Sequence, residues 1–366
     1  MAVIVVAGMA PTVGSDFLDL RVYRGAVEAM LSGHGLYDSG LRFGAGELSF
    51  LYPPFAALLV AATLWMPIGS AGMAWLLAQI GMASVLVWLM LRQNGSSARA
   101  SLPGSAPTVL LALGLFMMSQ PVLEGFALGQ MSLFIVMLST VDLLLLPSRW
   151  RGVLVGVSAA IKLTPLFFVA LFLVNRQWRA AATAVSAFVV STGLGFVVLP
   201  AESFEYWTRV VFDTSRVPGL GFEKNLTILG QLMFWGVPDA WQRPAWVVLA
   251  AVVATTVLWR ARQHWRAEER TSAVLVAGVG SSLVSPVAWP HLWVWLPMVA
   301  VHLTIAPKRA TRVVGWVGLV ASASWSPVWP PVTSSPGILA VIGCAPVLVG
   351  LCLAVLGLPR EARVRV

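Results

Sequence analysis

Two aspartates, Asp16 and Asp19, lie about one helical turn apart in the stretch DFLDLRVY, which follows a short apolar N-terminus. A carboxylate that faces a membrane-embedded cleft can act as a general base on a substrate hydroxyl. Either residue could instead cap a helix N-terminus, a contribution of about 1 kcal/mol. The pattern of residues 16–38 predicts an amphipathic helix, with Val22 and Ala26 on one face and Arg24 largely on another. Both roles stay open for either aspartate from this segment alone.

A lysine, Lys162, stands near the centre of the apolar run 152–174. A charge at that depth costs a few kcal/mol unless it is paired or hydrated. Snorkelling to the membrane surface is the alternative, but about ten residues separate the lysine from either end of the run. The sequence IKLTP, residues 161–165, predicts two half-helices that meet near Lys162. We interpret Lys162 as a cation for a buried phosphate or pyrophosphate.

The remaining candidates are weaker when each is taken alone. His291 stands among tryptophans and prolines in SPVAWPHLWVW, where a lone histidine is usually an interface residue. Lys224 and Asn225 in GFEKNLTILGQ could bind phosphate or sugar hydroxyls. The prolines of LYPPFAALL favour a helix start, and GQMSLF puts Gln130 at the entrance of another helix.

The composition indicates what must position these residues. The chain has 366 residues, of which 58% are hydrophobic and 11% are charged, whereas a soluble domain carries about 25% charged residues. We therefore predict an all-α polytopic membrane protein with about 11–12 membrane helices, folded as one integral-membrane domain over residues 1–366. The net charge of +9 is spread over short basic loops between apolar runs, which argues against nucleic acid as a partner.

The charge pattern also predicts sidedness. Basic residues mark short loops that we expect on the cytoplasmic side, such as 92–99, 260–270 and 308–312. Residues 14–50 hold five acids and three Arg or Lys, and residues 200–224 hold four acids and three Arg or Lys. We expect these two polar stretches to be extracytoplasmic loops, on the same side as His291. Runs 51–68 and 71–91 do not fit a simple alternation between the two sides of the membrane, and the number of times they cross it stays open.

Five stretches occur in the order found in glycosyltransferase family 87: DLRVYRGAVEAMLSGHGLYD, SFLYPPFAALLVA, LGQMSL, GVLVGVSAAIKLTPLFFVALFLV and SPVAWPHLWVW. The chain resembles the polyprenol-phosphate-mannose-dependent α-1,2-mannosyltransferases of that family, and the resemblance covers nearly its whole length. It implies a C-type glycosyltransferase helical bundle in the cytoplasmic membrane with an extracytoplasmic active site. It also implies a polyprenyl-phosphate sugar donor, a glycolipid or lipoglycan acceptor, inversion at the anomeric carbon, and no cofactor.

The resemblance assigns the family's base to Asp19 and a Trp-x-His stretch to His291, although Leu292 stands where the family often has a second histidine. The family's Asn-Gln-Ser loop matches only loosely at residues 225–227. With these two catalytic candidates we group the substrate-binding candidates Asp16, Arg21, Tyr23, Tyr52, Gln130, Lys162, Lys224 and Asn225, and no metal ligand.

Three functions are alternatives to mannosyl transfer. Within the same class, the donor sugar could be arabinofuranose. From other classes, the chain could be a lipid-linked sugar transporter or a structural partner in an envelope-building complex. The long polar stretch after the first apolar run favours an enzyme over a transporter, and a structural role leaves Lys162 unexplained.

Overall fold

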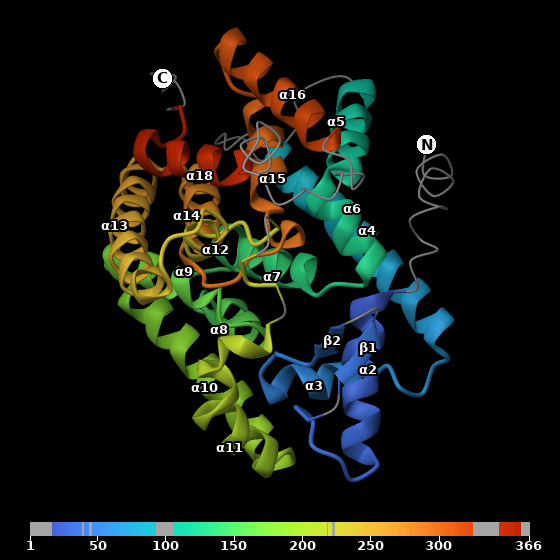
Figure 1. Ribbon diagram of the computed structural model, residues 1–366. Helices are drawn as coiled ribbons and strands as arrows, with labels where there is room; N and C mark the ends of the chain where they lie inside the picture. The colour runs from blue at the N-terminus through green and yellow to red at the C-terminus, as the bar shows by residue number, and fades with distance from the viewer. Residues whose placement is uncertain are drawn as a thin grey trace. The chain divides into compact units, whose positions relative to one another are not determined.

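The computed structural model describes residues 17–38, 40–43, 46–92, 106–217, 219–221, 224–324 and 344–359. These residues are mostly helical, as predicted (Figure 1). They divide into two compact units. The first consists of residues up to Gln79 together with Gly125–Leu220, and the second of Ile80–Glu124 together with the residues from Gly221 on. The single domain expected over residues 1–366 stays a prediction.

The first unit begins with helix α2, Leu18–Leu31, in the region where the sequence predicts an amphipathic helix. A hairpin of β1, Gly40–Phe43, and β2, Gly46–Ser49, follows and is antiparallel, with Gly40 opposite Ser49. The sequence analysis did not predict these strands. Helix α3, Pro54–Ala61, starts at the proline pair and packs against α2. α4, Ile68–Leu91, contributes its residues up to Gln79 to this unit.

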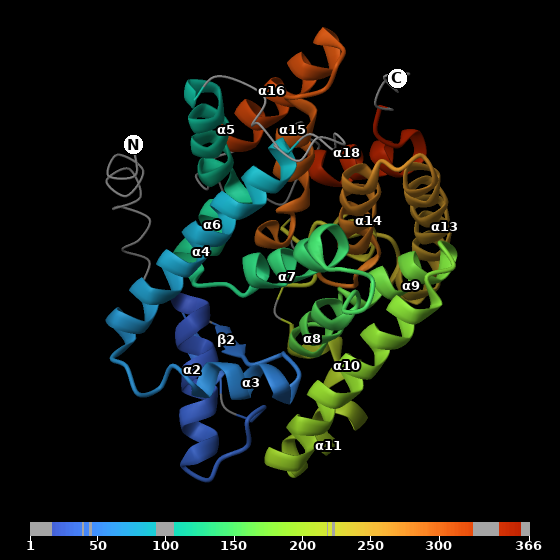
Figure 2. The ribbon, with the colours of Figure 1, turned by 180° about the vertical axis from the view of Figure 1, so that it is seen from behind.

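The rest of the first unit is helical. α7, Ser132–Leu145, and α10, Trp178–Val198, both pack against α8, Val153–Ile161. α9, Leu166–Val174, follows α8 after a short break, so the two half-helices predicted around Lys162 are confirmed. Within the polar stretch 200–224 lie α11, Pro200–Thr208, and the 3-10 turns Val210–Phe212 and Thr214–Arg216. Figure 2 shows α8 to α11 as successive segments of this unit.

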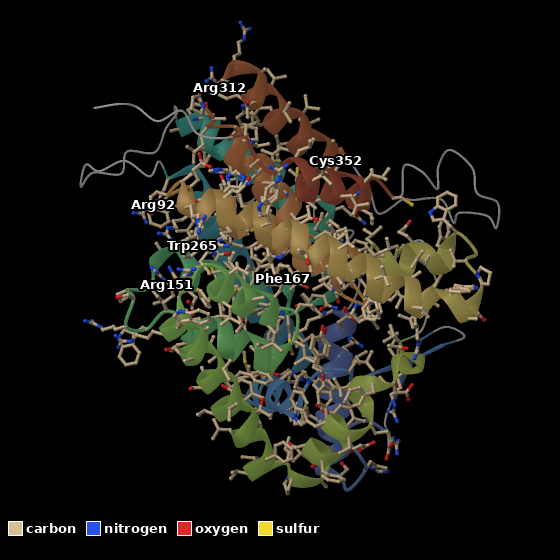
Figure 3. The ribbon with its side chains drawn as sticks, turned by 90° about the vertical axis from the view of Figure 1, so that its left-hand side faces the viewer. Arg92, Arg151, Phe167, Trp265, Arg312 and Cys352 are labelled. Atoms are coloured by element: carbon tan, nitrogen blue, oxygen red, sulfur yellow. The ribbon has the colours of Figure 1, made fainter. Side chains whose placement is uncertain are left out.

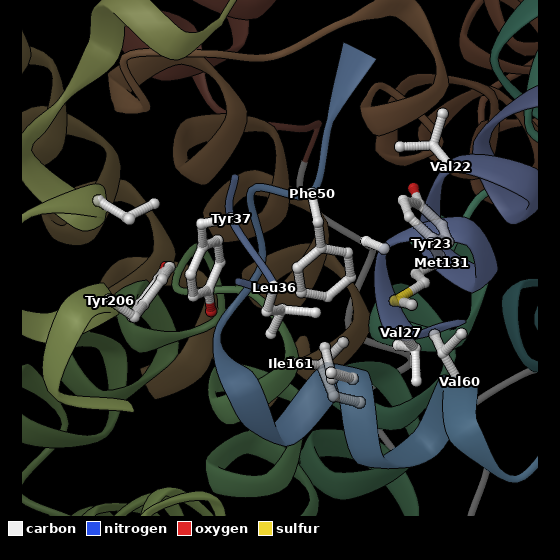
Figure 4. Close-up of a cluster of buried hydrophobic side chains, with 14 of the residues drawn as sticks. Val22, Tyr23, Val27, Leu36, Tyr37, Phe50, Val60, Met131, Ile161 and Tyr206 are labelled. Carbon is white, nitrogen blue, oxygen red and sulfur yellow. The ribbon is translucent and has the colours of Figure 1, made fainter. Parts of the chain in front are cut away.

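An aromatic core joins these elements in the first unit. Tyr23, Tyr37 and Phe50 are almost fully buried, and the ring of Tyr37 lies 6.0 Å from Phe50 and 5.7 Å from Tyr206 (Figure 4). Aromatic pairs of this kind contribute about 0.5–1.5 kcal/mol beyond the area they bury. Because the ring of Tyr23 in α2 also lies 6.0 Å from Phe50, the core links α2, through the residues on either side of the hairpin, to Tyr206 of α11.

The second unit contains the C-terminal part of α4, α5 Ala106–Met118, α6 Gln120–Leu128 as far as Glu124, α12 Ile228–Phe234, α13 Asp239–Arg266, α14 Arg270–Val284, the 3-10 turn η3 Pro290–Leu292, α15 Trp295–Leu303, α16 Arg309–Ser324 and α18 Ala345–Leu356. Of these, α13, α15 and α18 pack against α14. In Figure 3, Arg92, Trp265 and Arg312 of this unit lie toward the same edge of the view. These residues come from the segments that the charge pattern predicts to be cytoplasmic.

Within the described residues, three helices, α4, α10 and α13, are long and apolar enough to cross a membrane, and α5 with α6 adds a fourth if the bent pair is one span. Three further apolar helices, α7, α14 and α18, are shorter. The described residues thus hold fewer full-length spans than the 11–12 expected. The predicted run 51–68 holds the eight-residue helix α3, which starts at the proline pair and ends at Ala61. Run 152–174 is divided at Lys162, and Pro165 stands directly before α9.

Candidate active site

Helix α2 carries Asp19 in its first turn. The N-cap position is held by Phe17 in a left-handed conformation, with φ 48°, and no side chain caps the helix in the described residues. The carboxylate of Asp19 instead accepts a hydrogen bond from Nε2 of Gln130. The capping role is therefore not the one that Asp19 has in the structure. Asp16 lies outside the described residues.

Gln130 connects Asp19 to two tyrosines. Its Oε1 accepts hydrogen bonds from the hydroxyl of Tyr23 at 2.9 Å and from that of Tyr52 at 3.2 Å. The two hydroxyls are themselves 3.1 Å apart. Asp19, Tyr23, Tyr52 and Gln130 come from three separate stretches of the sequence, and the fold of the first unit joins them in one polar cluster.

The main chain holds Gln130 in place. Its N–H donates to the carbonyl of Gly125 at 2.9 Å, and its carbonyl accepts from Nε1 of Trp75 at 3.3 Å and from Nε2 of Gln79 at 2.7 Å. Gly129 just before it has φ +70°, and a Cβ there would lie 2.9 Å from Cβ of Leu20. Glycine is the residue that fits position 129, because the backbone there has a positive φ and Leu20 of α2 lies too close for a side chain.

Lys162 supplies the cation of the cluster. It follows the last residue of α8 in an extended conformation, with φ −153°. Its Nζ lies 5.1 Å from the centroid of the Tyr52 ring, in cation–π range. The lysine is near enough to Asp19 for its charge to favour the ionised carboxylate.

The surroundings shift the proton affinities of this cluster. α2 is not among the candidate membrane spans. Burial raises the pKa of Asp19 from 3.8 to about 6, although the hydrogen bond from Gln130 and the charge of Lys162 act to lower it. Burial also raises the pKa of Tyr23 well above 10.0, so this phenol stays protonated and can donate. A carboxylate with a pKa near neutrality is suited to general base catalysis.

Two arginines of α2 lie differently. Arg21 is exposed, whereas Arg24 is only 6% exposed, and its Nη2 donates to the carbonyl of Met66 at 2.9 Å. The amphipathic pattern predicts Arg24 on the polar face of this helix, and that prediction is wrong. The buried guanidinium joins α2 to the connection between α3 and α4.

The other three candidates belong to the second unit. His291 is buried in η3, and Lys224 is exposed. Asn225 is fully buried, with its Oδ1 accepting from the N–H of Ala288 at 3.1 Å and its Nδ2 donating to the carbonyl of Pro286 at 3.3 Å. In this structure the Asn225 amide joins the segment 224–227 to the segment that precedes His291.

Sequence reasoning missed two residues that support the site, Trp75 and Gln79. Gln79 is fully buried in α4. A lone amide within the apolar run 71–91 is a usable signal, because a buried amide needs hydrogen-bond partners. The sequence also gave no means to see that all four tyrosines of the chain, Tyr23, Tyr37, Tyr52 and Tyr206, belong to one unit.

The comparisons with known proteins bear on what this site does. The model of glycosyltransferase family 87 matches residues 50–286. The chain is 31% identical over 338 residues to the polyprenol-phosphate-mannose-dependent alpha-(1-2)-phosphatidylinositol mannoside mannosyltransferase of Mycolicibacterium smegmatis, covering 87% of this chain and 76% of that protein. It is 32% identical over 326 residues to the protein of the same name from Mycobacterium tuberculosis, covering 85% and 76%.

A third relative is the corresponding pentamannoside mannosyltransferase of Mycolicibacterium smegmatis, which is 28% identical over 310 residues, covering 83% of this chain and 74% of that protein. No solved structure matches the chain.

The fold and the site together define a polytopic helical membrane protein in which the partly buried carboxylate of Asp19 belongs to the same cluster as the cation of Lys162. The chain belongs to glycosyltransferase family 87, because the family model matches most of it and two relatives above 30% identity are covered over three quarters of their length. Membership of a family of enzymes decides against the transporter and the structural-partner hypotheses. The family match includes Tyr52, Gln130 and Lys162, while Asp19 and His291 lie outside its bounds.

Proposed function

We propose that the chain transfers a mannosyl residue from polyprenyl-phosphate-mannose to a mannose hydroxyl of a phosphatidylinositol mannoside or a related lipoglycan. The names of the relatives, which match over 83–87% of this chain, support this donor and this acceptor. One structural observation carries the chemistry: a partly buried carboxylate, Asp19, is joined to Gln130 in the same cluster as the cation of Lys162.

In the proposed reaction Asp19 takes the proton of the acceptor hydroxyl. The acceptor oxygen forms a bond to the anomeric carbon from the side opposite the phosphate. The bond between that carbon and the phosphate oxygen breaks, and its electron pair leaves with polyprenyl phosphate. This single displacement inverts the anomeric centre, and we propose that the product is the α-1,2 linkage.

Lys162 is the proposed partner of the phosphate as its charge develops, because a preorganised cation stabilises a leaving anion. His291, Lys224 and Arg21 stay proposed donors to the substrates, and Asn225 stays a proposed substrate-binding residue. No metal is required in this mechanism, so a chelator should leave transfer unchanged.

We place the reaction at the outer face of the cytoplasmic membrane. The support is the charge pattern: Asp19 belongs to an acidic polar stretch, while the short loops such as 308–312 are basic. A lipid-phosphate donor also needs no cytoplasmic nucleotide sugar. Cysteine labelling from outside intact cells, with one cysteine placed at exposed Asp38 and another at exposed Lys308, tests this sidedness.

Glycosyl transfer by the purified protein in lipid tests the function. Polyprenyl-phospho-mannose and polyprenyl-phospho-arabinose are supplied in parallel reactions, each with a phosphatidylinositol mannoside as acceptor. The same reactions are run with Asp19→Asn and, as a control at an exposed acid, with Asp38→Asn. We expect a mannosylated product that Asp19→Asn loses and Asp38→Asn keeps. A product from the arabinose donor alone would change the sugar, and no product from either donor would refute the proposed donor class.

A further inference from the structure

We propose that Gln130 is a positioning residue of this transfer reaction: its amide holds one carboxylate oxygen of Asp19 and leaves the other oxygen to take the proton. The inference rests on the proposed function and refines it.

The hydrogen bonds allow only one orientation of the Gln130 amide. An ionised carboxylate has no hydrogen to donate, so Asp19 must receive the N–H of Nε2. The protonated phenols of Tyr23 and Tyr52 then donate to Oε1 on the other side of the amide. A flipped amide would place its oxygen against the carboxylate oxygen. The two tyrosines therefore hold the amide in the orientation that serves Asp19.

Gln130 is the fixed member of this pair. Its main chain takes part in hydrogen bonds with Gly125, Trp75 and Gln79, and the residue as a whole is only 5% exposed. Asp19, in contrast, stands in the first turn of a helix without a side-chain cap. The amide thus sets the direction of the carboxylate, rather than following it.

The consequence concerns the two oxygens of Asp19. Oδ2 accepts from Gln130, and in the part of the chain that the structure describes Oδ1 accepts no hydrogen bond. Oδ1 is the atom that takes the proton of the acceptor hydroxyl as that oxygen bonds to the anomeric carbon and polyprenyl phosphate leaves. The bond from Gln130 also favours the ionised carboxylate, which is the form that acts as a base.

The first test is the pH profile of kcat for Gln130→Met, which keeps the length of the side chain but removes its hydrogen bonds. We expect the acid limb of the profile to move upward by about one pH unit, since a lost hydrogen bond to a charged group is of that size. We expect kcat to fall about 10–100-fold, with KM changed less than about twofold. Gln120→Met, at the start of α6, is the control and should leave the profile unchanged.

Tyr23→Phe tests whether the tyrosine acts through the amide. Alone it should move the acid limb in the same direction by a smaller amount. In the Gln130→Met background it should add nothing, because the amide that it orients is gone. Additive shifts, or a lower melting temperature with an unchanged acid limb, would overturn the positioning role.

A direct titration separates this inference from the proposed function. The infrared carboxyl band of Asp19, obtained as the difference between the wild type and Asp19→Asn in nanodiscs, reports its protonation without any substrate. We expect its midpoint to rise in Gln130→Met. If the midpoint rises but no donor gives transfer, Gln130 orients Asp19 and the proposed function fails. If transfer is observed but the midpoint does not move, the positioning role fails.

Discussion

The first unit contains two aspartates in very different surroundings, Asp19 and Asp142. Asp142 of α7 is fully buried and accepts backbone N–H groups from Gly152 at 2.6 Å, Leu154 at 2.7 Å and Val155 at 3.0 Å. Leu154 and Val155 lie in the first turn of α8, where backbone N–H groups lack helical partners. Asp142 therefore caps a helix that follows it in the chain.

Asp19 shows the opposite arrangement. Its only hydrogen-bond partner in the described residues is one side-chain amide, and it does not cap its own helix. A carboxylate whose two oxygens both accept backbone N–H groups serves as a structural acceptor. A carboxylate with one partner keeps a free oxygen for chemistry. The two aspartates are the same residue type, and they differ in the number and kind of their hydrogen-bond donors.

Replacing each aspartate by asparagine should separate the two roles. Asp19→Asn removes the base, and we expect transfer to fall about 10³-fold, since a general base contributes about 10²–10⁴. Asp142→Asn keeps one side-chain oxygen that can accept from the N–H groups. The transfer rate per folded molecule should therefore stay within a few-fold of the wild-type rate. Initial rates, normalised to the folded fraction, measure both. Equal losses in the two variants would contradict the comparison.

Asp142→Ala tests the structural role of Asp142, because it removes the carboxylate that accepts the N–H groups at the start of α8. The change leaves three N–H groups near the start of α8 without their acceptor, and we expect a loss of about 2–4 kcal/mol in the free energy of unfolding. Thermal unfolding in detergent measures the effect, with Asp19→Ala as the matched variant. A larger loss for Asp19→Ala would mean that Asp19, too, is mainly structural.

The pH dependence should sharpen the comparison. Because the pKa of Asp19 is raised to about 6, the carboxyl is neutral below that pH and cannot act as a base. We expect the transfer rate to fall about tenfold for each pH unit below 6 and to level off above it. The acid limb should be measured on kcat/KM, because that quantity reports the free enzyme to which this pKa belongs. A rate that stays constant down to pH 4.5 would remove Asp19 as the titrating base.

The same shift has a consequence for stability. The raised pKa means that the folded state holds a proton that the unfolded state releases between about pH 4 and pH 6. Asp19 therefore makes the folded state less stable as the pH rises through this window. Asp19→Asn should remove that part of the pH dependence of unfolding.

Much of this site could be predicted from sequence, because its residue types conflict with their surroundings. Lys162 stands out in an apolar run, and the following proline indicates the break between α8 and α9, which the structure confirms. Asp19 and Gln130 were also named as candidates. Their hydrogen bond could not be predicted, because it joins residues 111 positions apart and depends on tertiary packing.

Other features had no local signal. The strands β1 and β2 are only four residues each, so the alternation of Leu41 with Phe43 and of Leu48 with Phe50 is too short to distinguish strands from a loop. Asp142 lies near the end of an apolar run, where a charge suggests only proximity to the membrane surface. Its role as a cap depends on the turn that brings α8 back to α7.

Gly129→Ala should give the smallest effect and tests how closely α2 must approach Gln130. An alanine at this position would be strained at φ +70°, and its Cβ would press on Leu20 in the turn of α2 that carries Asp19. We expect a loss of about 1–2 kcal/mol in stability and a several-fold fall in kcat from the displaced carboxylate. Gly25→Ala in the same helix is the control, because no atom lies within 4 Å of the added Cβ. If Gly129→Ala lowers stability but leaves kcat and its acid limb unchanged, the contact holds the helix in place without setting the position of Asp19.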